Sequence, residues 1–69
     1  MFINDAYFRD LNLQFGEHIY LMIETGEGFT GYFHGNYNGD SFVFYNFSVG
    51  HEQRIRIVNL QILERVKKM

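Results

Sequence analysis

The one segment whose spacing matches a known ligand-binding fingerprint is rich in glycine. Gly26, Gly28 and Gly31 fit the pattern GxGxxG, in which a loop cradles the pyrophosphate of a dinucleotide. That chemistry requires the loop to join a strand to a helix, because the N-terminus of the helix receives the phosphates. Here the third glycine lies inside a predicted strand and no crossover helix follows. We therefore interpret the match as coincidental and expect no nucleotide cofactor.

The residue types that catalyse reactions show no supporting pattern. Nucleophilic catalysis needs a serine, threonine or cysteine beside a base that a third group orients. Ser41 and Ser48 are the only serines, and neither has such a context. The three histidines, His18, His34 and His51, have no metal-ligand spacing, and cysteine is absent. We predict a protein that is not an enzyme and that holds no metal or other cofactor.

Aromatic side chains near basic ones favour a different chemistry, the binding of nucleic acid. The chain has eight phenylalanines and five tyrosines among its 69 residues. An exposed ring can stack on a base, which contributes about 1–3 kcal/mol per base. Most of these rings must fill the core of so small a protein, but a ring at a loop mouth could be such a platform. Phe42, just after a predicted turn at Asp40, is the candidate.

Charge is distributed unevenly along the chain. Residues 1–53 carry seven acidic side chains and one basic side chain, Arg9, so their net charge is −6. Residues 54–69 carry five basic side chains and one acidic side chain, Glu64, so their net charge is +4, and the whole chain has −2. Two interpretations stay open: solvated charges that protect a C-terminal edge strand, or a local surface that attracts anions.

The predicted elements that position these residues begin with a helix over residues 4–15. Asn4 is placed to cap the helix, and Gly16 is placed to end it. Spacings of one, four and eight residues put several apolar side chains on one face, which predicts that the helix packs against the rest of the protein. These residues are Tyr7, Phe8, Leu11 and Phe15.

From His18 onward the apolar residues alternate with a period of two, which indicates strands. Turn residues at 25–28 and 38–40 separate the first three strands, and Gly31 and Gly35 on one strand face allow sharp bending. We predict one domain over residues 1–69 that is mostly β, with a short N-terminal α-helix and a strongly bent five-stranded antiparallel small β-barrel of SH3-like shape. The predicted strands span residues 18–24, 29–37, 41–48, 54–58 and 61–67, with a loop at 49–53.

Small size makes self-association the expected source of additional stability. A chain of this length buries only about 60% of its unfolded surface, and without cysteine it has no disulfides. The absence of cysteine also fits a reducing compartment, and no signal peptide is visible. The longest apolar run, residues 19–23, is far shorter than the roughly 20 residues of a membrane helix. We expect a cytoplasmic protein with no membrane partner.

The order of these elements resembles the Sm-like family, which includes the Sm, LSm and Hfq-type proteins, and the chain is similar to a divergent member. Residues 19–23, a glycine-bearing turn and residues 29–33 with Gly31 are similar to the first two strands of that family. Residues 40–44 resemble its Asp-x-aromatic-hydrophobic stretch. Residues 55–63 resemble its second motif, in which a hydrophobic residue and an arginine come before a glycine.

The resemblance implies a ring of identical subunits, closed by pairing of the fourth strand of one subunit with the fifth strand of the next. It also implies RNA binding, with a base held between Phe42 at the stacking position and Arg56 at the basic position. The sequence departs from the family pattern at two pocket positions. Phe44 replaces the asparagine that reads the base edge, and Ile57 replaces the glycine that follows the arginine.

Two functions therefore stay open for a homo-oligomeric ring. In the first, the ring binds single-stranded RNA weakly or through a surface other than the usual pocket, and the basic C-terminal residues support this. In the second, the ring is a non-catalytic structural or protein-binding scaffold that binds no RNA, and the two pocket departures and the net negative charge favour this.

Overall fold

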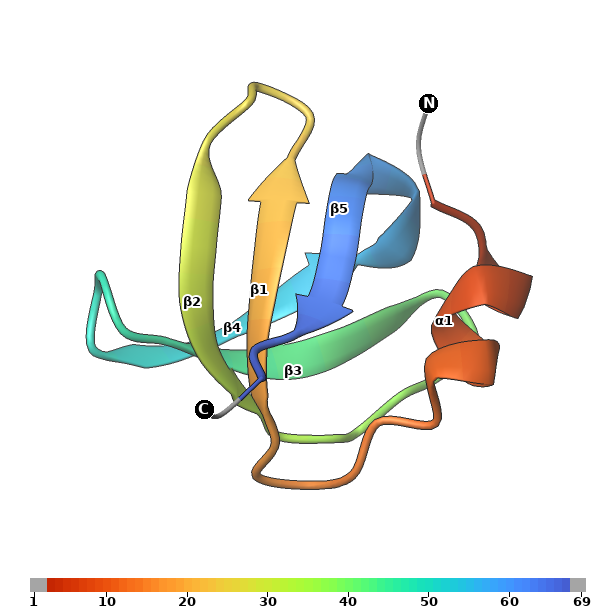
Figure 1. Ribbon diagram of the computed structural model, residues 1–69, viewed down its shortest axis with the longest axis horizontal. Coiled ribbons are helices and arrows are strands. Elements are labelled where there is room, and N and C mark those ends of the chain that lie inside the picture. Colours follow the sequence, from red (N-terminus) through yellow and green to blue (C-terminus); the bar gives the residue numbers. More distant parts are fainter. Residues whose placement is uncertain (1–2, 68–69) are drawn as a thin grey trace.

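The computed structural model of this protein describes residues 3–67 and contains one α-helix, one 3-10 helix and five strands in that range. Figure 1 shows their arrangement. The prediction of a mostly β chain with a short N-terminal helix is confirmed. In chain order the elements are α1 (Asp5–Leu11), β1 (His18–Ile23), β2 (Gly28–Phe33), β3 (Ser41–Asn46), β4 (His51–Arg56), the 3-10 helix η1 (Ile57–Asn59) and β5 (Leu60–Arg65).

The five strands form a single antiparallel sheet in the order β4-β3-β2-β1-β5. The two outermost strands are joined only by η1, which is three residues long. Because this connection is so short, the sheet must bend until its two edges approach each other at η1. Figure 1 shows that β3 and β4 run across β1, β2 and β5. The sheet is open, since no ladder joins β4 to β5 within residues 3–67.

Gly31 lies where β2 is paired with both β1 and β3. A Cβ atom at this position would overlap the backbone carbonyl oxygen of Tyr45, so glycine alone permits so close an approach. The predicted role of glycine in bending the sheet therefore applies to Gly31. It does not apply to Gly35, which has φ of +71° and lies in the loop after β2, because that strand ends at Phe33.

A bulge in β5 adds to the curvature and was not predicted from the sequence. The register of β1 against β5 shifts between Met22 and Ile23, which leaves Gln61 as an extra residue on β5. The side-chain amide of Gln61 donates to the backbone carbonyl oxygens of Ile23 and Glu24, at 3.2 and 3.0 Å. Bulges of this kind bend a strand and increase its local twist.

The helix α1 is shorter than predicted. Asn4 caps its N-terminus, as expected, but the helix ends at Leu11. The prediction that Gly16 ends the helix is wrong, because Asn12 already adopts the left-handed conformation, with φ of 50°, and stops the helical hydrogen bonding. Phe15 consequently lies outside the helix and is 74% exposed rather than packed.

The strand boundaries differ from the predicted ones on both sides of β3. β2 ends before the predicted limit of 37, because Gly35 and Asn36 both have positive φ, which is incompatible with a strand. β4 starts at His51, inside the predicted 49–53 loop, because a turn at residues 47–50 already reverses the chain. The predicted start of this strand at 54 is therefore wrong, and residues 57–59 form η1 instead of continuing it.

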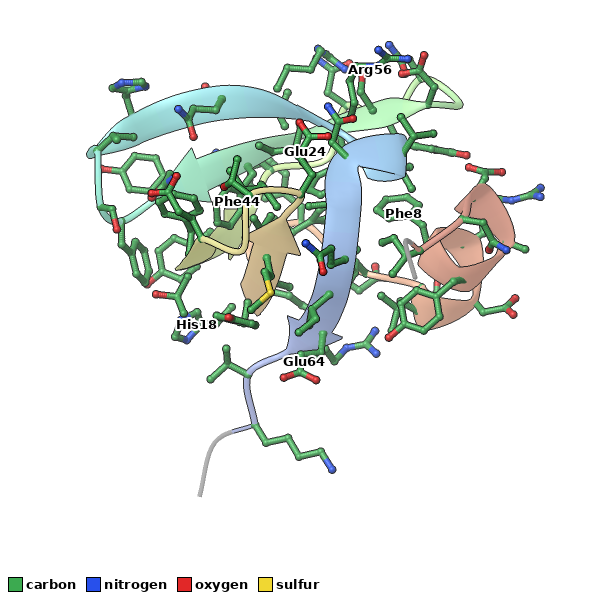
Figure 2. The ribbon with its side chains drawn as sticks, turned by 90° about the horizontal axis from the view of Figure 1, so that it is seen from above. Phe8, His18, Glu24, Phe44, Arg56 and Glu64 are labelled. Atoms are coloured by element: carbon green, nitrogen blue, oxygen red, sulfur yellow. The ribbon has the colours of Figure 1, made fainter. Side chains whose placement is uncertain are left out.

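The core lies inside the bend of the sheet, and α1 covers one side of it. The ring of Phe8 lies 5.1 Å from that of Phe42 and 6.1 Å from that of Phe33, measured between centroids. Figure 2 shows Phe8 pointing from α1 toward the sheet. Within residues 3–67, nine hydrophobic side chains are buried: Phe8, Ile19, Leu21, Phe33, Phe42, Phe44, Ile57, Leu60 and Leu63.

Candidate functional site

Phe42, the predicted stacking residue, lies in the core. Its side chain is completely buried, and its ring plane is inclined by only 19° to that of Phe8, with 5.1 Å between the centroids. On another side the ring of Phe33 lies 5.5 Å away. A base could stack on Phe42 only if α1 and Phe8 moved away. The RNA-binding role of Phe42 stays a prediction that requires this displacement.

Arg56, the predicted basic residue, is exposed at the end of β4 (Figure 2). The register pairs Arg56 with Ser41 and Ile55 with Phe42. Because successive side chains of a strand point to opposite faces of the sheet, Arg56 projects from the face opposite to Phe42. A single subunit therefore does not bring these two side chains together into one pocket.

The two positions that depart from the family pattern are both core positions in this structure. Phe44 is completely buried, and its ring is among the atoms nearest to Gly31. Ile57 is 1% exposed and begins η1, where its backbone N–H donates to the carbonyl oxygen of Asp40 at 2.9 Å. Both side chains are therefore occupied by packing in the core.

The outer edge of β4 is uncovered. Along an antiparallel ladder, residues whose backbone groups bond to the partner strand alternate with residues whose backbone groups face away from it. The bond from the Ile57 N–H to the Asp40 carbonyl oxygen shows which residues of β4 belong to each set. By this alternation Glu52, Arg54 and Arg56 direct their backbone N–H and C=O groups away from β3. In the described part of the chain, no other strand pairs with them.

The outer edge of β5 is partly covered by the N-terminal segment. The hydroxyl of Tyr7 donates to the carbonyl oxygen of Leu63 at 2.9 Å, and the backbone N–H of Ile3 donates to that of Leu60 at 3.0 Å. Near the end of the strand, the guanidinium of Arg65 donates to backbone carbonyl oxygens at the end of α1. Fewer backbone groups are therefore available on β5 than on β4.

An ion pair holds the loop before β1 to the end of β5. The Nε of Arg65 donates to the carboxylate of Glu17 at 2.5 Å, and the backbone N–H of Gln14 donates to the same carboxylate at 2.6 Å. The bond from Arg65, followed by that from Gln14, lowers the pKa of Glu17. The carboxylate is therefore ionised at neutral pH and fixes the position of Arg65.

A group of aromatic rings covers the outer face of β1, β2 and β3, opposite to the core. His18 pairs with Tyr32, and Tyr32 pairs with Tyr45, so these three rings form one row across the sheet. Rings on the flanking loops extend the row, and neighbouring centroids lie 4.9–6.5 Å apart. We call this group the aromatic surface: Phe15, His18, Tyr32, His34, Tyr45 and Phe47.

Sequence reasoning missed the aromatic surface because it assigned most aromatic residues to the core. The signal was nevertheless present, since His18 and Tyr32 occupy strand positions that alternate with the buried Ile19 and Phe33. Period-two alternation therefore places both rings on the face away from the core.

Residues 3–67 contain neither a cluster of metal-binding side chains nor a helix that could cross a membrane. No group of three His, Cys, Asp or Glu side chains there lies close enough together to hold a metal ion. The helices of the same range include none that is long and apolar enough to cross a membrane.

Comparisons of this chain with models of protein families, with curated proteins and with solved structures each found no match. The resemblance to the Sm-like family therefore rests on the order and spacing of motifs in the sequence. Because one fold can support many functions, the function has to be argued from the surfaces described above.

Proposed function

We propose that this chain is a non-catalytic, Sm-like module that assembles into a homo-oligomeric ring and associates with single-stranded RNA. The observation that supports assembly is the open sheet, which has β4 at one edge and β5 at the other. An uncovered edge offers unpaired N–H and C=O groups to another strand. Because the two edges differ, pairing of β4 with β5 of a second copy is head-to-tail, and such contacts close into rings or continue as filaments.

The small size of the core provides a physical reason for assembly. A chain of 69 residues has little apolar surface to bury, and this one has no disulfide to compensate. Pairing of edge strands satisfies backbone groups and adds buried surface without new core residues. A cytoplasmic location is part of this proposal and rests on the absence of cysteine.

Replacing Arg54 with proline tests the role of the β4 edge. The backbone N–H of Arg54 faces away from β3, so Arg54→Pro removes a donor that only a partner strand would use, at an edge position where proline is tolerated. We expect Arg54→Pro to keep the fold by circular dichroism and to reduce the molar mass in light scattering to that of smaller species.

The matched control is Arg54→Ala, which keeps the N–H. Both variants lose the side-chain bonds from Arg54 to the Asn36 carbonyl oxygen and the Ser41 hydroxyl, at 3.2 and 2.9 Å. We expect Arg54→Ala to retain the mass of the parent. Equal masses for folded Arg54→Pro and its parent would show that β4 is not the assembly edge.

RNA association is supported by the resemblance in sequence and by the basic residues of the C-terminal part of the chain. The alternative function, a scaffold without RNA binding, is favoured by one specific observation: Phe42 is buried under α1 and lies on the opposite sheet face from Arg56. Contacts with phosphates would appear as an affinity that falls steeply with salt concentration. If the protein keeps its assembled mass but binds no RNA at low salt, its function is that of a scaffold and not of an RNA-binding ring.

A further inference from the structure

Several rings of the aromatic surface are exposed although the protein has a small core to fill. Phe15 is 74%, Phe47 43% and Tyr32 42% exposed. Contiguous exposed apolar groups are uncommon on small soluble proteins outside binding sites. The rings stand on the sheet face and on the adjoining loops, and none belongs to β4 or β5, so pairing of β4 with β5 of another copy would leave them accessible.

The rings are held in fixed positions by one another and by the backbone. Phe15 stacks on His34 with the planes 10° apart, and Phe47 meets Tyr32 nearly edge to face, at 86°, with 4.9 Å between the centroids in both pairs. The hydroxyl of Tyr45 donates to the carbonyl oxygen of Gly50 at 3.1 Å. Groups that are ordered before binding lose less conformational entropy when a ligand stacks on them.

Positive charge lies on one side of the aromatic surface, on the outer face of β4. Arg54 and Arg56 lie on the outer face of β4, opposite Val43 and Ser41, which are two and four positions along β3 from Tyr45. At the other side, the backbone N–H of Val66 donates to the carbonyl oxygen of His18 at 3.0 Å, so Val66 lies beside the row of rings on the outer face.

One of the acidic groups near the aromatic surface, Glu17, forms an ion pair, and a second, Glu52, is hydrogen-bonded to a ring of that surface. Glu17 is paired with Arg65, and Glu52 lies 2.6 Å from the ring nitrogen Nδ1 of His34. Glu64, opposite Tyr20 on the outer face, has no ion pair within residues 3–67. Arg54 and Arg56 also have none there, so both guanidinium groups are available to pair with phosphates.

A groove adjoins the row of rings where a ligand could leave the sheet face. It is lined by Gly16, Glu17, His18, Tyr32, Arg65 and Val66. The groove therefore combines two ring residues with a guanidinium that Glu17 already holds in place. An aromatic platform with a polar groove and with cations on one side matches the needs of an unpaired nucleotide strand, whose bases stack while its phosphates pair with positive charge.

We propose that the aromatic surface is the binding site for single-stranded RNA, with bases stacked on Tyr32 and Phe47 and phosphates directed toward Arg54 and Arg56. This inference rests on the proposed RNA association and names its site. It replaces stacking on the buried Phe42 with stacking on rings that are already exposed.

Two substitutions of one ring separate stacking from simple apolar contact. Phe47→Leu keeps an apolar side chain without a π face, whereas Phe47→Tyr keeps the ring. With short oligouridine and oligoadenosine as probes, we expect Phe47→Leu to weaken binding about 5- to 150-fold, the equivalent of one stacked base, and Phe47→Tyr to bind like the parent. Val58→Ala changes another exposed apolar residue, away from this surface, and serves as the control.

The molar mass of every variant is measured together with its affinity for RNA. Loss of binding by Phe47→Leu at unchanged mass, with Phe47→Tyr unaffected, supports the site. Binding by the parent that neither Phe47→Leu nor Tyr32→Leu weakens overturns the site but leaves the proposed function intact. No RNA binding by the parent overturns RNA association itself. A changed mass in Phe47→Leu would show that the aromatic surface is a contact between copies, which also overturns the inference.

Discussion

At Gly31, β2 passes so close to β3 that a Cβ atom would overlap the carbonyl oxygen of Tyr45. At Gly50 the requirement is different, because φ is +73° but no atom lies within 4 Å of a Cβ placed there. One glycine is thus needed for space and the other for backbone conformation. Substitution of each glycine by valine therefore tests the two requirements separately.

Gly31→Val should destabilise the protein more than Gly50→Val. At Gly31 the new side chain must displace the backbone of β3, and we expect a loss of at least about 3 kcal/mol in the free energy of unfolding. At Gly50 the cost is that of a left-handed conformation, about 1–2 kcal/mol. Thermal or urea unfolding of both variants measures the difference. A larger loss for Gly50→Val would mean that the close approach of β2 to β3 is not tight in solution.

Residue-level features could be predicted from the sequence where they depend on local alternation, as at Gly31. Features that depend on contact with a residue distant in the chain could not be predicted. The motif order marks Phe42 as a candidate platform, but its burial depends on Phe8, 34 positions away, whose ring covers it. Spacing along one strand contains no information about such a contact.

At the scale of elements, α1 covers the edge of β5. Tyr7 supplies the contact by donating its hydroxyl to the outward-facing carbonyl oxygen of Leu63. That carbonyl is one of the groups that β4 of a second copy would use. Complete pairing of β5 therefore requires Tyr7 to release it, so α1 competes with assembly.

Tyr7→Phe should strengthen self-association. The substitution keeps the ring and removes only the hydroxyl, so the Leu63 carbonyl oxygen becomes available without first breaking a bond worth about 1 kcal/mol. We expect the concentration at which the protein assembles to fall about fivefold, measured by sedimentation or light scattering over a dilution series.

Tyr37→Phe is the control for this change. The hydroxyl of Tyr37 donates to the carboxylate of Asp5 instead of to β5, and the ring is about as exposed as that of Tyr7, at 36% against 44%. Its assembly should match that of the parent. Weaker assembly of Tyr7→Phe would show that the bond to Leu63 belongs to the assembled form.

Most elements could be predicted from the sequence, but their limits could not. The alternation of apolar residues identifies β1 and β3 because one face of each packs against the core. β4 lacks this signal, since its sequence HEQRIR is mostly polar and only its last part alternates. Its ladder with β3 starts at His51 because a tight turn at 47–50 makes pairing possible, which hydropathy does not report.

At the scale of the whole molecule, an open and sharply bent sheet leaves two different strand edges and one aromatic face. The edges account for the proposed assembly, and the face accounts for the proposed RNA site. The two surfaces use different groups, because assembly uses backbone groups of β4 and β5, whereas the RNA site uses rings on β1, β2, β3 and the adjoining loops together with the side chains of Arg54 and Arg56. A ring could therefore present several aromatic surfaces at once, and multivalent contact would raise the affinity for a long RNA.

The molar mass in solution tests the central claim most directly. The single chain has a mass of 8.2 kDa. Multi-angle light scattering after gel filtration at micromolar concentration should give one species with an integral multiple of that mass, because head-to-tail pairing of β4 with β5 closes only when a fixed number of copies has joined. A stable, monodisperse monomer over the same concentrations would contradict pairing of these edges and, with it, the ring.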